Sequence, residues 1–202
     1  MLSDGDQPRR SFASSSRALT RESPGERITF GHLEALDAEA AVEFARQRAP
    51  SERLAVIGIL LGGAAALLAP KPLNVDALIL ESVYPDIDDA TANRLESYLG
   101  VGGRLLTPAY MRLMPLVLGF EPGQLRPIDR IASVRAPVLV LSGAEDPYTT
   151  LAEARDLFEH AHERKSFWSV PGASHVDLFH FAPDDYRRHV LPFLATHLRQ
   201  PG

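Results

Sequence analysis

The chain has 202 residues, 45% hydrophobic and 23% charged, which suits one globular domain with its own core. Its net charge of −5 and the absence of a Lys/Arg block argue against a phosphate-binding surface, so we expect no nucleic-acid partner. The sequence has no cysteine, which excludes disulfides, a thiol nucleophile and a thiolate metal site. No apolar run approaches the ~20 residues that span a bilayer, so we expect no membrane partner and a cytoplasmic protein.

The first 24 residues differ in composition from the remainder. They are polar and serine-rich, with few large apolar side chains. Such a segment buries too little surface to offset the entropy of ordering it. Residues 1–24 are therefore predicted to form a flexible tail, and residues 25–202 to form the domain.

Apolar periodicity predicts an alternation of helices and strands from residue 30 onward. The first helix, at 30–48, carries an apolar stripe made by Leu33, Leu36, Ala40, Val42 and Phe44. The strand at 54–59 is continuously apolar, as expected for a parallel strand covered on both faces. The later elements are a helix at 61–69, a strand at 75–80, a helical insert at about 86–120, a strand at 138–143, a helix at 151–162, a strand at 167–170 and a helix at 183–198.

This order predicts an α/β fold with a mostly parallel sheet of about four strands, joined by right-handed crossovers and flanked by helices. The insert at 86–120 is rich in aromatic and methionine side chains. We expect it to form a small helical cap, although two helices packed on the core would produce the same pattern. Ligand chemistry in such sheets gathers at the carboxyl ends of the strands.

Three segments at strand ends carry the candidate site. The first is VIGILLGG at 56–63, a strand, a glycine-flanked turn and the start of a helix. Gly-x-Ser-x-Gly in such a turn raises a nucleophilic serine above a sheet, but here leucine, Leu60, stands in the serine position. The other two segments follow later strands and carry Asp146 and His175, which gives the chain order nucleophile position, acid, histidine.

Together these segments resemble the α/β-hydrolase superfamily, close to its serine aminopeptidase-like and dienelactone hydrolase-like groups. The matching residues are Gly58-Ile59-Leu60-Leu61-Gly62-Gly63, Gly143-Ala144-Glu145-Asp146 and Gly172-Ala173-Ser174-His175. The resemblance runs from about residue 23 to residue 198. It implies that Asp146 is the triad acid and His175 the general base. Leu60 replaces the nucleophile and has no lone pair to attack a carbonyl, so we expect impaired catalysis. We also expect Leu60 to keep a positive φ.

The resemblance also implies an N-terminal truncation. Members of the family carry four strands before the helix at 30–48, and a loop that supplies an oxyanion-hole N–H. The strand at 54–59 would then have one unpaired, apolar edge. We expect this edge to bind a second copy or a partner chain.

The main hypothesis is a protein descended from a Ser-His-Asp hydrolase of esters, thioesters or peptides that retains a site for a small acyl-type ligand. That site would be lined by Leu60, Tyr84, Asp146, Tyr148 and His175. One alternative is a non-catalytic ligand- or partner-binding protein that uses the exposed sheet edge. Another is an active hydrolase acting through Ser82 or through a water activated by His175 and Asp146. The resemblance implies no cofactor. The spacing of His175, Asp177 and His180 is too weak a signal for a metal site, so we expect no metal.

Overall fold

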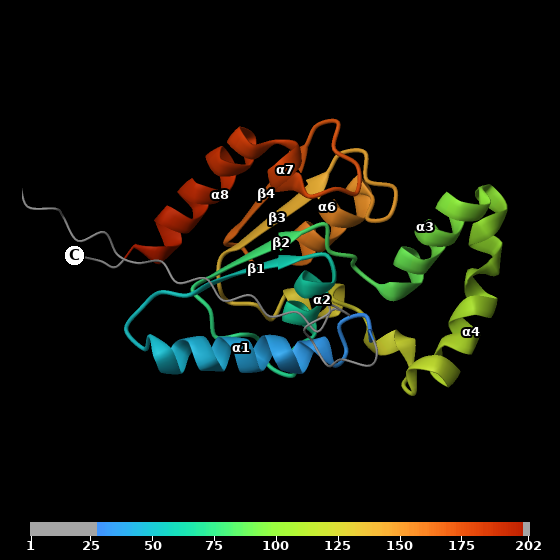
Figure 1. The fold of residues 1–202 in the computed structure, drawn as a ribbon, viewed down its shortest axis with the longest axis horizontal. Coiled ribbons are helices and arrows are strands. Elements are labelled where there is room, and N and C mark those ends of the chain that lie inside the picture. Colours follow the sequence, from blue (N-terminus) through green and yellow to red (C-terminus); the bar gives the residue numbers. More distant parts are fainter. Residues whose placement is uncertain (1–27, 200–202) are drawn as a thin grey trace, which may run out of the picture.

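Four parallel strands form one sheet, in the order β1-β2-β3-β4, in the computed structural model, which describes residues 28–199 (Figure 1). The strands are β1 (Ala55–Ile59), β2 (Ala77–Glu81), β3 (Val138–Gly143) and β4 (Lys165–Val170). This confirms the predicted α/β fold with its four-stranded parallel sheet. The flexible tail predicted at 1–24 lies outside the described residues.

Helices connect and flank the strands. They are α1 (Glu34–Arg48), α2 (Leu61–Leu68), α3 (Ile87–Leu99), α4 (Thr107–Leu118), α5 (Ile128–Ile131), α6 (Leu151–His160), α7 (Leu178–Phe181) and α8 (Pro183–Leu198), with 3₁₀ turns η1 (Val101–Leu106) and η2 (Pro122–Gln124). One face carries α2, α5 and α6, and the opposite face carries α7 and α8. None of the helices within 28–199 combines the length and apolarity needed to cross a bilayer.

The central strands β2 and β3 are buried along their whole length. Alternate side chains serve the two cores: Leu78 and Leu80 pack toward α2 and α6, whereas Ile79 packs toward α7 and α8. Burial on both faces explains why these strands read as continuous apolar runs rather than as an alternating pattern.

The strand β1 lies at the edge of the sheet and, within the described residues, pairs only with β2. The expectation that both of its faces are covered is wrong. Val56 packs into the α2 core, but Ile57 and Ile59 project to the α8 face and remain 42% and 47% exposed. The reason is that α7 and α8 pack over β2 and β3 and stop short of β1. An uncharged, apolar edge strand is therefore left open.

The apolar stripe predicted on the first helix also differs from what is observed. Helix α1 packs along α2 and buries Ala35 and Val42. Leu33, Leu36 and Phe44, which the stripe assigned to the core, remain exposed. The small side chains of α2 admit the alanine-rich side of α1, and this close packing turns the larger side chains outward.

Helix α1 begins four residues later than predicted, because Glu34 folds the preceding residues into a turn. Its buried carboxylate accepts hydrogen bonds from Thr29 N, Thr29 Oγ1 and Gly31 N at 2.9, 2.6 and 3.0 Å. Burial raises the pKa of Glu34, but these hydrogen bonds outweigh it and hold the pKa below the usual value. Gly31, with φ 103°, makes the positive-φ turn that follows.

A second carboxylate, Asp76, fixes the start of β1 against the start of β2. Its Oδ2 accepts hydrogen bonds from Leu54 N and Arg46 Nη2, both at 2.8 Å, and its Oδ1 lies 2.7 Å from Arg53 Nη1. Burial raises the pKa of Asp76. The hydrogen bond from Leu54 and the two arginines outweigh burial, so the pKa lies below the usual value of an aspartate.

We predict that Asp76→Asn lowers the free energy of unfolding at pH 7 by about 1–2 kcal/mol, because two charge-assisted bonds are lost. A carboxylate with a lowered pKa stabilises the fold above its unfolded pKa, and this contribution disappears as the pH falls through the folded pKa. The difference between the two proteins should therefore shrink below about pH 4. Urea unfolding at pH 7, 5 and 3 measures it, and a constant difference would contradict the prediction.

Candidate active site

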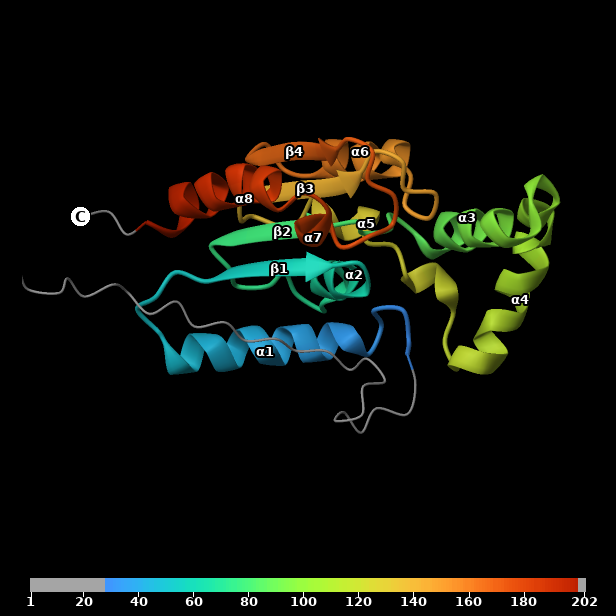
Figure 2. The same cartoon turned by 45° about the horizontal axis from the view of Figure 1, so that its top comes forward.

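The carboxyl ends of all four strands lie along one edge of the sheet, facing the helices α3 and α4 (Figures 1 and 2). Leu60 follows β1, Glu81 ends β2 and Ser82 follows it, Asp146 comes after β3, and His175 comes after β4. The parallel topology thus gathers at one edge residues that are more than one hundred positions apart in sequence.

Leu60 occupies a sharp turn between β1 and α2. Its φ is 51° and its ψ is −119°, so the predicted positive φ is confirmed. Its N–H donates to Glu81 O at 2.8 Å, and its carbonyl accepts from Gly63 N and Ala64 N in the first turn of α2. A branched side chain in this region costs about 1–3 kcal/mol, so the surrounding contacts must hold the turn in place.

Two glycines allow the turn to close. A β-carbon placed on Gly63 would lie 2.1 Å from Val83 Cγ2 and 2.8 Å from the Gly58 carbonyl oxygen. A β-carbon on Gly58 would lie 2.5 Å from Gly63 Cα. Strand β1 and helix α2 therefore touch through bare backbone at this point. Gly62, by contrast, has open space around it.

Asp146 and His175 form a hydrogen-bonded pair across two loops. His175 Nδ1 lies 2.8 Å from Asp146 Oδ2, with the aspartate side chain fully buried and the histidine 20% exposed. The other aspartate oxygen accepts the backbone N–H groups of Tyr148 and Thr149, at 2.8 and 3.0 Å. These bonds fix the carboxylate, which orients the imidazole through Nδ1 and leaves Nε2 as the ring nitrogen available for proton transfer.

Tyr148 forms a second contact with the imidazole. Its ring meets His175 edge-on, with centroids 5.0 Å apart and an interplanar angle of 81°. The guanidinium of Arg94, on helix α3, lies 3.7 Å from the centre of the Tyr148 ring. A cation over an aromatic face is a favourable contact. The histidine loop and the helix α3 are thereby linked through one tyrosine.

Glu81 was not singled out by its sequence pattern, yet it connects the turn at Leu60 to the histidine loop. Its carbonyl accepts the Leu60 N–H, while its buried carboxyl accepts Leu178 N at 3.3 Å and Tyr186 Oη at 3.1 Å. Burial raises the pKa of Glu81, and nearby Asp177 raises it further. An acid at the end of an otherwise apolar strand was the signal available in the sequence.

Ser82 lies beside the turn but points into the protein. It also has a positive φ, 49°, and its carbonyl accepts Thr149 Oγ1 at 3.4 Å. Its residue is 4% exposed, and its Oγ is buried without a hydrogen-bond partner among the described residues. Through Glu81, Ser82 and Thr149, a continuous series of contacts joins Leu60 to the Asp146–His175 pair.

The other histidine considered in the sequence, His180, does not join this group. It is paired with Asp177 at 2.8 Å on the surface, whereas His175 faces Asp146. Within residues 28–199, no three His, Cys, Asp or Glu side chains are placed to hold a metal ion. A cavity of about 510 Å³ lies elsewhere, between α1, the end of α2 and the η2–α5 segment, and Leu60, Asp146 and His175 are not among its lining residues.

Comparison with curated proteins finds relatives that span much of the chain. It is 30% identical over 171 residues to the alpha/beta hydrolase domain-containing protein WAV2 of Arabidopsis thaliana, covering 80% of this chain and 53% of WAV2. It is 31% identical over 145 residues to the uncharacterized protein Rv2307c of Mycobacterium tuberculosis, covering 71% of this chain and 46% of that protein. The chain thus spans about half the length of these relatives. No family model matches it.

Solved structures show the same fold at lower identity. The esterase Pf2001 of Pyrococcus furiosus aligns with a TM-score of 0.68 at 22% identity, over 88% of this chain and 67% of the esterase. The esterase Est2 of Thermogutta terrifontis, in a butyrate-bound structure, aligns with a TM-score of 0.62 at 19% identity, over 87% of this chain and 69% of Est2.

We predict that Gly63→Ala destabilises the protein by about 2–3 kcal/mol, because the new methyl group overlaps Val83 and the Gly58 backbone. The matched control is Gly62→Ala in the same helical turn. Since Gly62 is unobstructed, alanine there should stabilise the helix by up to about 1 kcal/mol. Thermal unfolding of both variants provides the comparison, and equal effects would refute the close contact.

Proposed function

The chain belongs to the α/β-hydrolase superfamily, and on this premise we propose that it is a catalytically impaired member that binds a small acyl-type ligand. The observation that carries the proposal is the pairing of two features. Leu60 adopts the positive-φ turn between strand and helix, and the Asp146–His175 pair remains hydrogen-bonded at the same sheet edge. Leu60 thus places an aliphatic side chain in the kind of strand-to-helix turn that carries the nucleophile in this superfamily.

The consequence for chemistry is specific. Leu60 offers no atom that can form an acyl-enzyme. The imidazole of His175 is oriented by Asp146, but the residue in the nucleophile position has no hydroxyl for it to deprotonate. Acyl transfer needs both groups. We therefore infer that any ester turnover by the described residues is far below that of a complete triad.

The ligand class follows from the surroundings of the pair. Leu60 is apolar and 38% exposed, and the Tyr148 ring packs edge-on against His175. These groups favour an apolar chain next to a polar head that can accept or donate a hydrogen bond at His175. The butyrate-bound Est2 structure is a similar fold holding a short carboxylate, and this supports the proposed class of guest.

Ser82 is a poor substitute nucleophile. Its hydroxyl is buried, and its carbonyl is held by Thr149. Its backbone N–H is held as well, because it donates to Leu141 O on β3 at 2.9 Å.

We predict that Leu60→Ser restores covalent reactivity toward a fluorophosphonate probe. The introduced hydroxyl would attack phosphorus, its proton would pass to His175, and fluoride would leave. Labelling followed by mass spectrometry should modify the peptide that contains position 60, at least about 100-fold faster than in the wild-type chain.

The controls separate the two parts of the proposal. The double variant Leu60→Ser/His175→Ala should lose the labelling, because no base remains, and Leu60→Ala should not label. If folded Leu60→Ser fails to react, or if the wild-type chain reacts at another residue, the proposed assignment of Leu60 and His175 is wrong.

A second candidate function rests on the open edge of β1. Ile57 and Ile59 are exposed on a strand with no second partner among the described residues, and this arrangement suits pairing with another strand.

We predict that the chain forms a dimer at micromolar concentration, measured by light scattering after size exclusion, and that Ile57→Lys shifts it to a monomer. A monomeric wild-type chain would contradict this function.

A further inference from the structure

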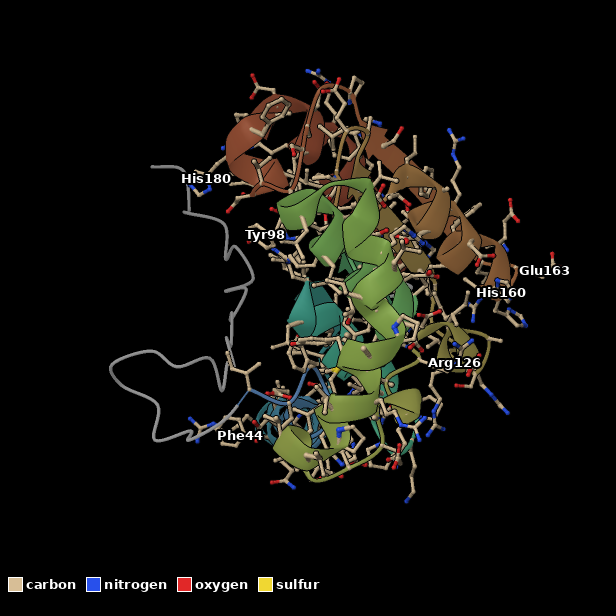
Figure 3. The ribbon with its side chains drawn as sticks, turned by 90° about the vertical axis from the view of Figure 1, so that its right-hand side faces the viewer. Phe44, Tyr98, Arg126, His160, Glu163 and His180 are labelled. Carbon is tan, nitrogen blue, oxygen red and sulfur yellow. The ribbon has the colours of Figure 1, made fainter. Side chains whose placement is uncertain are left out.

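Tyr148 lies between the candidate site and helix α3. Its backbone N–H donates to Asp146 Oδ1 at 2.8 Å, and its ring meets the imidazole of His175 edge-on. Two further contacts of Tyr148 come from α3, which projects with α4 beyond the carboxyl ends of the strands (Figures 1 and 2). In the view of Figure 3 these two helices lie in front of the sheet. Tyr148 therefore connects the Asp146–His175 pair to an element outside the sheet.

Asn93, on α3, holds the backbone of Tyr148. Its Nδ2 donates to Tyr148 O at 3.2 Å and to Glu153 Oε1 at 2.6 Å, and its Oδ1 accepts from Arg104 Nη1 at 2.9 Å. The asparagine is 6% exposed. A reversed amide would place its oxygen against two other oxygens, so these partners fix its orientation. Asn93 thereby attaches helix α3 to the loop between β3 and α6.

Arg94, the next residue of α3, contacts the ring of Tyr148. Its guanidinium carbon lies 3.7 Å from the ring centre, well within the ~6 Å over which an aromatic face attracts a cation. Arg94 is exposed, and within residues 28–199 it forms no ion pair with a carboxylate. The Tyr148 ring is therefore the group on which the charge of Arg94 acts.

We propose that Arg94 is a positioning residue for His175, which acts by holding the Tyr148 ring edge-on against the imidazole. The Tyr148 hydroxyl forms no hydrogen bond within residues 28–199, so the ring depends on the contacts of its faces and edges. Removing the cation from one face allows the tyrosine side chain to leave this rotamer more often.

The ring matters to His175 because Asp146 alone does not fix the imidazole. The bond between His175 Nδ1 and Asp146 Oδ2 orients one edge of the ring and permits it to pivot about that bond. The Tyr148 ring, with its centroid 5.0 Å from that of His175, restricts the pivot. This inference rests on the proposed function only for the importance that it gives to His175 as a base.

The test measures the position of the Tyr148 ring by NMR, through the ring-current shift that it produces at the imidazole C–H protons of His175. The full chain is labelled with ¹³C-histidine, and His175→Gln identifies the His175 signals among those of the seven histidines. Tyr148→Leu removes the ring and defines the shift without it. Spectra are compared at the high-pH limit of the titration, so that differences in protonation do not contribute.

Arg94→Met removes the cation and keeps a long side chain. It should move the His175 signals at least about half of the way to their position in Tyr148→Leu. Arg94→Lys retains a cation and should stay closer to the wild type. Arg112→Met is the matched control, because Arg112 is also an exposed arginine but lies on α4, outside these contacts. It should leave the His175 signals unchanged.

The inference is overturned if Arg94→Met leaves the His175 signals in place, or if Arg112→Met moves them as far. Unchanged His175 signals in Tyr148→Leu would also overturn it, since the ring would then not lie against the imidazole. His189, which stacks on Trp168 beside β4, reports on the fold. A shift at His189 in Arg94→Met as large as the shift at His175 would show a general structural change and would equally overturn the inference.

No reaction is measured in this test, so its result is separate from the labelling experiment. If Leu60→Ser fails to label while Arg94→Met moves the His175 signals, the proposed function is wrong and the positioning role of Arg94 stands. If Leu60→Ser labels while Arg94→Met leaves the His175 signals in place, the proposed function stands and the positioning role is wrong.

Discussion

The Glu81 carboxyl accepts hydrogen bonds from the Leu178 N–H and the Tyr186 hydroxyl, while the carbonyl of the same residue accepts the Leu60 N–H. These bonds connect the turn after β1 and the end of β2 to helices α7 and α8, which follow the loop that carries His175. A carboxyl buried this deeply is stable only because its oxygens are hydrogen-bonded. The geometry of the candidate site therefore depends on one acid that takes no part in the chemistry proposed for it.

Much of the fold could be predicted from the sequence because the signals are local and strong. Continuous Val/Ile/Leu runs mark β2 and β3, and the alternation of these runs with helical segments predicts a parallel sheet. The elbow at Leu60 could be located because glycines flank it. The contact between Asp146 and His175 was expected only from the order of the loops, and the structure places their side chains within hydrogen-bonding distance.

The exposure of side chains on α1 and β1 and the contacts of Glu81 could not be predicted. They depend on which elements pack beside each segment, and the local sequence of a segment does not show this. The apolar side chains of α1 and β1 predicted burial, but burial requires an opposing surface, and none is present within residues 28–199 for Phe44 or Ile57. The contribution of Glu81 was missed for a related reason, because its partners lie about one hundred residues away. Leu60 illustrates the opposite case: its backbone strain persists because Gly58 and Gly63 fix the turn, whatever side chain occupies it.

Because β1 lies at the edge of the sheet, its backbone N–H and C=O groups fall into two sets that differ in hydrogen bonding. Leu54 O and Leu60 N form hydrogen bonds toward β2. The N–H and C=O groups of even-numbered residues in β1 therefore point toward β2, and those of Ala55, Ile57 and Ile59 point away from the sheet. Amide deuteration of this strand should then follow residue parity, with slow and fast positions alternating along five consecutive residues. A molecule that added a further strand to β1 would slow hydrogen exchange only at Ala55, Ile57 and Ile59. The exchange rates of these three amides would therefore report whether the open edge of β1 is bound.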